Sequence, residues 1–147
     1  MVIHVNKGLT LPEVFNIVRL KEDRQEKIKT LHSYDTKALR WFVNALYNVD
    51  WSVLPKVDFK PNKRPVGVCT LTIHTSITRL ETALKYATTN PKVAEKNLII
   101  VLEEVSEAES KLLLDMFNGR KVEGVSKAVF AKVYPQFFRS EETDQAD

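Results

Sequence analysis

The stretch that begins at Ser106 and ends at Pro135 constrains the fold most, because it contains two helix starts and one helix stop. Ser106 and Glu109 have the spacing of a capping box, in which side chains bind the free N–H groups of a first helical turn. Gly119 is typical of a helix end, since glycine readily adopts the left-handed conformation found there. Ser126 predicts a second N-cap, and Pro135 ends that helix because it has no N–H to donate. We therefore expect two helices joined by a short turn.

Apolar residues within this stretch recur at helical spacing and predict which faces are buried. The first helix is expected to bury Ala108, Leu112, Leu113 and Met116, and the second Val125, Val129 and Val133. The connecting turn carries Arg120, Lys121, Glu123 and Gly124. Positive charge and exposed backbone N–H groups in one turn favour binding of phosphate.

Composition favours an all-α fold. Only four glycines occur among 147 residues, which disfavours a β-sandwich with its many glycine-rich turns. The hydrophobic share of 44% is that of a globular protein, yet no apolar run is long enough to span a bilayer. The single cysteine, Cys69, excludes an internal disulfide and fits a reducing compartment. We predict a compact single domain of about seven helices, located in the cytoplasm.

Further capping residues and apolar stripes predict the other five helices. The first helix begins at Thr10 and Glu13, and the second covers Asp23–Ser33. The third begins at Asp35 and has one apolar face, formed by Leu39, Phe42, Val43 and Leu46. The fourth is marked by Ile73, Ile77, Leu80 and Leu84, and the fifth begins at Asn90-Pro91. We expect a short extended arm at 1–9, the helical domain at 10–139 and an acidic disordered tail at 140–147.

The segment 49–68 interrupts the helical pattern. It carries Pro55, Pro61 and Pro65, interleaved with Lys56, Lys60, Lys63 and Arg64. Three prolines exclude a continuous helix, so a long basic connector is predicted. Two interpretations stay open, a functional loop or a solvated linker held by Trp51, Leu54 and Phe59.

Charge is distributed unevenly along the chain. The net charge is +3, but the tail after Arg139 contains four carboxylates and no base, so the preceding part is near +7. A body of that charge suits a polyanionic partner. Excess lysine that serves only solubility is the alternative.

The sequence contains no catalytic constellation. His4, His32 and His74 lie far apart, and the single cysteine offers no zinc spacing. The turn Gly124-Val125-Ser126-Lys127-Ala128 approaches a nucleophile elbow but lacks the second glycine, and no P-loop is present. We therefore expect no enzyme activity, no cofactor and no metal.

Basic residues near three predicted turns are the remaining candidates for function. One group surrounds the first interhelical turn, at Arg19, Lys21, Arg24 and Lys27. The other basic candidates, which we predict to hold a phosphate backbone, are Lys37, Arg40, Lys60, Lys63, Arg64, Arg120, Lys121 and Lys127. The helix N-termini at Asp35 and Ser126 are expected to add N–H donors. Such contacts position a backbone without selecting sequence.

The order of these elements resembles the N-terminal α-helical DNA-binding domain of ATP-dependent DNA ligases, closest to the T-even phage type. The similarity runs from about Leu11 to Phe138. Three shorter segments contribute to it, namely Arg24-Gln25-Glu26-Lys27, Ala38 to Tyr47 and Thr70-Leu71-Thr72. The most specific segment is LLLDMFNGRKVEGVSKAVFAKVYPQFF, in which a Gly-x-Ser turn leads to Lys132-Val133-Tyr134-Pro135. The chain also resembles small tailed-phage proteins that have this domain alone.

The resemblance implies that Gly124, Val125, Ser126 and Lys127 face the minor groove and backbone of duplex DNA. Ligases continue into a core with a Lys-x-Asp-Gly motif, whereas this sequence contains no Asp-Gly dipeptide, so ligase activity is not expected unless a second chain supplies it. The first hypothesis is a non-catalytic duplex-binding module in phage replication, repair or host takeover. The alternative is a module that binds a replication, host or virion protein, with Trp41, Trp51 and Phe59 as anchors if they are exposed, and no membrane partner.

Overall fold

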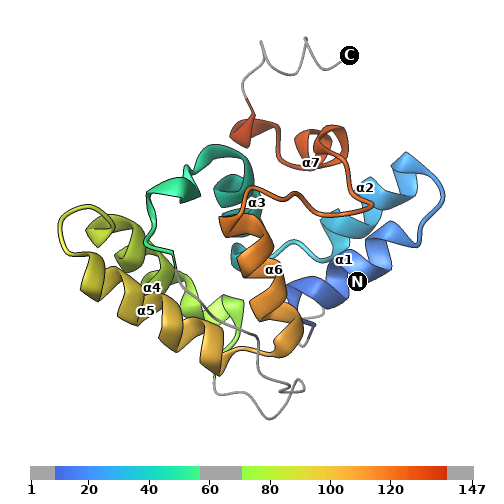
Figure 1. Cartoon of the computed structure of the whole chain (residues 1–147). Coiled ribbons are helices and arrows are strands. Elements are labelled where there is room, and N and C mark those ends of the chain that lie inside the picture. The colour runs from blue at the N-terminus through green and yellow to red at the C-terminus, as the bar shows by residue number, and fades with distance from the viewer. Residues whose placement is uncertain (1–8, 57–70, 139–147) are drawn as a thin grey trace. The chain divides into compact units, whose positions relative to one another are not determined.

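The computed structural model describes residues 9–56 and 71–138, and all regular structure in these residues is helical (Figure 1). Seven α-helices and two 3-10 helices are present there, and no strand, which confirms the predicted all-α class with about seven helices. The elements are α1 (Leu11–Arg19), α2 (Arg24–Ser33), α3 (Lys37–Asn48), η1 (Trp51–Val53), α4 (Ile73–Tyr86), α5 (Pro91–Glu104), α6 (Glu107–Phe117), α7 (Lys127–Val133) and η2 (Pro135–Phe137).

The chain divides into two compact units. Unit 1 combines the residues up to Val49 with those from Val122 onward, and it contains α1, α2, α3, α7 and η2. Unit 2 runs from Asp50 to Lys121 and contains η1, α4, α5 and α6. The single domain over 10–139 stays a prediction, and the tail at 140–147 and all but the last residue of the arm lie outside the described residues.

An aromatic core holds unit 1 together. The rings of Phe15 on α1 and Phe42 on α3 lie 5.6 Å apart, and Phe15 meets Phe130 on α7 edge to face at 6.0 Å. All three side chains are buried, as is the predicted stripe of α3. Aromatic pairs of this geometry add to the stabilisation from burial. The C-terminal helix is therefore part of the same core as the first and third helices.

The carboxylate of Asp35 links two parts of unit 1 that are far apart in sequence. It accepts a 2.7 Å hydrogen bond from the Tyr134 hydroxyl and a 2.8 Å bond from Arg40. The N-cap of α3 is Thr36, whose hydroxyl accepts from the Leu39 N–H at 3.1 Å. The prediction that Asp35 opens this helix is thus wrong by one residue, because its side chain binds Tyr134 and Arg40 instead.

Unit 2 is built on the hairpin of α4 and α5, which lie side by side (Figure 1). The predicted Asn90-Pro91 start is confirmed, with the Asn90 side chain accepting from the Val93 N–H. The Trp51 ring lies 5.0 Å from the Phe117 ring and is only 6% exposed. The condition for Trp51 to serve as a binding anchor, that it is exposed, is therefore not met, because the ring packs inside unit 2. Phe59 lies outside the described residues, and Trp41 is half-buried.

A buried glutamate joins the starts of two helices in unit 2. Glu109 is 1% exposed, and its Oε2 accepts a 2.8 Å bond from the Ile73 N–H at the start of α4. Its Oε1 accepts from the Ser106 hydroxyl, while the Ser106 Oγ accepts from the Glu109 N–H, as the predicted cap required. The predicted apolar face is wrong at Ala108, which is exposed, because Glu109 occupies the buried side.

Two other predicted helix boundaries are confirmed by their hydrogen bonds. The Glu13 carboxylate accepts from the Thr10 N–H at 2.9 Å at the start of α1. At the end of α6, Gly119 has a φ of 77° and its N–H donates to Met116. The backbone N–H of Arg120 donates to the backbone carbonyl oxygen of Asp115 at 2.8 Å, which completes a Schellman motif.

Candidate nucleic-acid interface

The turn before α7 lies against the end of α1. Gly124 has a φ of 81°, and a Cβ added to it would lie 2.7 Å from the Cβ of Arg19. Both the backbone conformation and the available space therefore require glycine at this position. The contact places the basic turn between α1 and α2 beside the segment that leads into α7.

Lys27 connects α2 to the same turn. Its Nζ donates a 2.8 Å hydrogen bond to the Gly124 carbonyl oxygen. A carbonyl is a neutral acceptor, so the positive charge of Lys27 is not neutralised by this contact. An ammonium group also has three N–H donors, of which this bond uses one. Lys27 thus orders the turn and retains charge and donors for a ligand.

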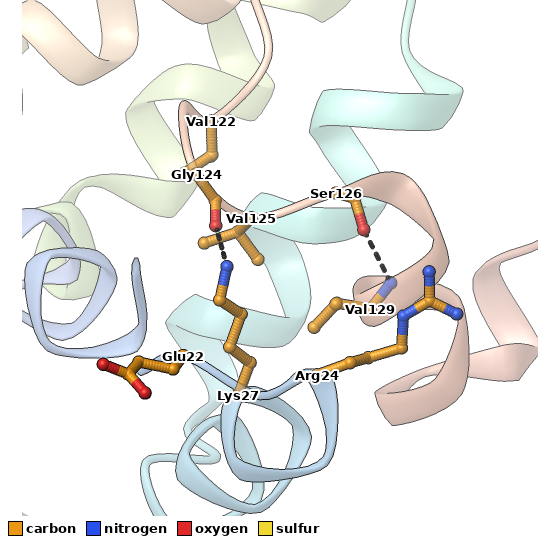
Figure 2. A pocket seen from close by; sticks show the side chains of 8 residues that line it. All are labelled: Glu22, Arg24, Lys27, Val122, Gly124, Val125, Ser126 and Val129. Carbon is orange, nitrogen blue, oxygen red and sulfur yellow. Dashed lines mark hydrogen bonds between the residues drawn. The ribbon is translucent and has the colours of Figure 1, made fainter. Parts of the chain in front are cut away.

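Arg24 and Lys27 line one hollow with the turn (Figure 2). Its volume is about 410 Å³, and its other lining residues are Glu22, Val122, Gly124, Val125, Ser126 and Val129. Figure 2 shows the side chains of Arg24 and Glu22 pointing in opposite directions. Arg24 is exposed, and its guanidinium group forms no hydrogen bond or ion pair with another described residue. The hollow therefore offers a free guanidinium group next to a partly occupied ammonium group.

The residues that the resemblance assigns to the groove differ in what they can present. Val125 is 2% exposed, so it can offer a partner only its backbone. Ser126 is exposed, but its hydroxyl accepts from the Val129 N–H at 3.3 Å as the N-cap of α7. Lys127 is also exposed, with its Nζ 5.9 Å from the centre of the Phe138 ring. Among these residues Lys127 presents the only charged side chain.

The remaining predicted residues are spread over both units. In unit 1, Lys37 is exposed at the start of α3, whereas Arg40 is paired with Asp35. In unit 2, Arg120 forms a 3.3 Å ion pair with Asp115, and Lys121 is exposed. The loop residues Lys60, Lys63 and Arg64 lie outside the described residues. Convergence of all three basic turns on one face stays a prediction.

Arg24 and Lys27 stand out in the sequence as basic residues near the first turn, but nothing in the sequence connects them with the Gly124 turn. The two segments are about a hundred residues apart, and the packing of α2 on α7 brings them together. A helical pattern in the sequence shows which side of a helix is apolar, but it does not show which helix covers it. The isolated Gly124 before a helix start was the one signal that a close backbone contact occurs there.

Charge is also divided between the units. The described part of unit 1 contains nine lysines and arginines against six acidic residues, whereas the described part of unit 2 contains eight of each. The excess base among the described residues is therefore confined to unit 1. A polyanion is expected to bind this unit more strongly than the other.

In the described residues, these features define an all-helical fold with a basic hollow at an ordered turn of unit 1. Comparison of the chain with family models, with curated proteins and with solved structures found no match. Within the described residues, no group of three or more His, Cys, Asp or Glu side chains could hold a metal ion. No helix there is both long and apolar enough to cross a membrane.

Proposed function

We propose that this chain is a non-catalytic module that binds duplex DNA with little sequence preference. Cationic side chains hold the phosphate backbone, and the turn from Gly124 to Lys127 lies near the minor groove. Contacts to phosphate supply affinity and orientation but carry no sequence information. The resemblance to the ligase DNA-binding domain suggests a role in phage replication, repair or takeover of host DNA.

The observation that supports this proposal most is the hollow lined by Arg24 and Lys27. One group has no described partner and the other binds a neutral carbonyl, so neither charge is compensated by a described carboxylate. An anion that enters the hollow gains charge-assisted hydrogen bonds from both. Ion-paired Arg40 and Arg120 would first have to leave Asp35 and Asp115.

A titration of labelled duplex against the full chain by fluorescence anisotropy, repeated from low to high salt, tests the proposal. The logarithm of the binding constant should fall linearly with the logarithm of salt concentration, with a slope of about −0.9 for each phosphate neutralised. Duplexes of unrelated sequence should give the same affinity. Absence of binding at low salt would contradict the proposal.

Charge reversal at Arg24 tests whether the hollow takes part. Arg24→Glu should weaken binding to all duplexes about tenfold or more and reduce the salt slope, because it replaces a phosphate contact with repulsion. Lys92→Glu is the matched control, since Lys92 is exposed on α5 of unit 2 and the change in net charge is the same. Equal effects of the two substitutions would assign binding to net charge and not to the hollow.

The same titration tests the predicted role of the turn after α6. Arg120→Glu and Lys121→Glu should weaken binding of all sequences alike if this turn contacts the backbone. Unchanged affinity would remove both residues from the interface and leave the site in unit 1.

The alternative, a module that binds a replication, host or virion protein, has less support. Binding anchors in protein interfaces are large side chains that are exposed before the partner arrives. Trp51 is buried, and the large apolar side chains exposed among the described residues are Leu20 and Val53, one in each unit. Two single residues do not form an apolar patch of the size that such interfaces use.

A further inference from the structure

An exposed leucine lies within the most basic turn of unit 1. Leu20 follows the last residue of α1 and is 78% exposed, which makes it the most exposed large apolar residue among the described residues. Its neighbours in sequence are Arg19 and Lys21, and Arg24 begins the next helix. Three basic residues therefore lie within four positions of Leu20 in the sequence, and its exposed side chain contributes little to the core.

Leu20 also belongs to a hydrogen-bonded turn, and residues on either side of it in sequence reach the hollow or the Gly124 turn. The Leu20 N–H donates to the Ile17 carbonyl oxygen at 3.3 Å, and the Lys21 N–H donates to the Val18 carbonyl oxygen at 3.1 Å. The preceding residue, Arg19, lies against Gly124, and Glu22, two residues further on, lines the hollow. A ligand phosphate bound by Arg24 and Lys27 would thus lie close to this turn. Because the turn is hydrogen-bonded, presenting Leu20 costs little additional conformational entropy.

We propose that Leu20 is an apolar wedge that enters the minor groove of duplex DNA and unstacks a base step, while the surrounding cations hold the phosphates. This proposal depends on the proposed function and adds to it a class of preferred substrate, namely duplex that deforms easily. Minor-groove proteins insert leucine and similar side chains in this way, and the unstacking is least costly at mismatches and at pyrimidine–purine steps.

Two other occupants of this surface are less consistent with the described residues. Binding to a membrane surface needs an apolar face along a helix, and Leu20 and Val53 do not form one. A protein partner would have to bury Leu20 and also neutralise Arg19, Lys21 and Arg24, which have no ion pair with a described residue. A duplex supplies the anions and an apolar step together.

The test uses the full chain and two duplexes of equal length, one fully matched and one with a central mismatch, each carrying 2-aminopurine beside the central step. We expect the wild-type chain to bind the mismatched duplex about tenfold more tightly and to raise 2-aminopurine fluorescence at saturation, because the base is unstacked. Leu20→Ala should abolish both the preference and the rise. Leu20→Phe should retain both, since a large apolar side chain is still present.

Three outcomes separate the wedge from the proposed function. Wild-type binding without a fluorescence rise, or a rise that Leu20→Ala retains, overturns the wedge and leaves duplex binding intact. Absence of any wild-type binding at low salt overturns both. Arg24→Ala should weaken binding to both duplexes by the same factor and keep the preference, because it removes only a phosphate contact.

Val53→Ala is the matched control for the loss of an exposed apolar side chain. Val53 is 42% exposed and belongs to η1 of unit 2. The control variant should retain both the preference and the fluorescence rise. If it loses them to the same extent as Leu20→Ala, the effect is not specific to the turn between α1 and α2, and the wedge is overturned. Circular dichroism of each variant should match the wild type, since both residues are exposed.

Discussion

Individual residues of this chain serve functions that their types alone do not reveal. Glu109 has the position of an ordinary capping-box glutamate, yet it is buried and also accepts the Ile73 N–H of a second helix. Lys27, one of the basic residues around the first interhelical turn, donates to the Gly124 carbonyl oxygen. Gly124 is required both for its positive φ and for its contact with Arg19. Each of these roles involves a partner far away in sequence.

The close contact at Gly124 predicts a specific coupling. Gly124→Ala should lower the free energy of unfolding by about 2–4 kcal/mol, because a Cβ is disfavoured at positive φ and would meet the Arg19 Cβ at 2.7 Å. Combining it with Arg19→Gly, which removes that Cβ, should cost less than the sum of the single changes in a urea-unfolding double-mutant cycle. Gly119→Ala, with nothing within 4 Å of its added Cβ, should cost only about 1–2 kcal/mol. Additivity of the Gly124 and Arg19 changes would contradict the contact.

The buried bonds of Glu109 predict a large effect of its removal. Glu109→Ala should lower the free energy of unfolding by about 2–4 kcal/mol, because the Ile73 N–H and the Ser106 hydroxyl lose their acceptor in a buried site. Glu109→Gln should cost less, since the amide retains one acceptor oxygen. Glu103→Ala on the exposed face of α5 is the control and should change stability by less than about 0.5 kcal/mol. Similar effects at 103 and 109 in chemical denaturation would refute this role.

At the scale of helices and turns, local hydrogen bonds define where each element begins and ends. Thr10, Asp23, Thr36, Asn90, Ser106 and Ser126 are the N-cap residues of α1, α2, α3, α5, α6 and α7. All of these except Thr36 could be predicted, because the hydrogen bonds of a cap span only two or three residues. At α3 the adjacent Asp35 is also a common cap residue, and the prediction placed the helix start there. The bond from Tyr134 to Asp35 is different, since it joins the end of α7 to the start of α3.

This link predicts a loss of stability in alkali. Burial, together with the hydrogen bond to the Asp35 carboxylate, raises the pKa of Tyr134 above its ordinary value of 10.0. The stabilisation is therefore complete below about pH 10, where the phenol is protonated in both states, and is lost as pH rises, because the unfolded chain releases the proton first. Burial also raises the pKa of Tyr47 to about 12, so it contributes in the same direction.

Urea unfolding between pH 8 and pH 11 measures this effect. The free energy of unfolding of the wild type should fall across this range, and Tyr134→Phe should show a shallower fall from a lower starting value, because it also lacks the hydrogen bond. Tyr34→Phe is the control, since the Tyr34 hydroxyl has no hydrogen bond to a described residue. An identical pH dependence in Tyr134→Phe and wild type would contradict the assignment.

For the whole molecule, the distribution of charge is the main determinant of the proposed activity. The excess base of the described residues belongs to unit 1, and the four acidic residues after Arg139 lower the net charge to +3. A polyanion responds to the summed field of all these groups as well as to its direct contacts.

Removal of residues 140–147 should therefore strengthen binding of duplex DNA. The net charge rises from +3 to +7, so affinity at low salt should increase several-fold, with the difference disappearing as salt screens the charges. Anisotropy titrations at two salt concentrations measure this change. A full-length chain with the four carboxylates replaced by Asn and Gln should behave in the same way if charge is the cause. Unchanged affinity at low salt in both variants would exclude an electrostatic effect of the tail.

The sequence alone determined the helical class, the helix boundaries to within a residue or two, and the buried faces of α3 and α7. These properties depend on hydrogen bonds and side-chain spacings within a few residues. Only the tertiary structure decided that Trp51 and Glu109 are buried, that Asp35 binds Tyr134, and that α2 brings Lys27 to Gly124. Such contacts depend on which apolar faces pack together, and helices of similar periodicity allow many pairings that local patterns do not distinguish.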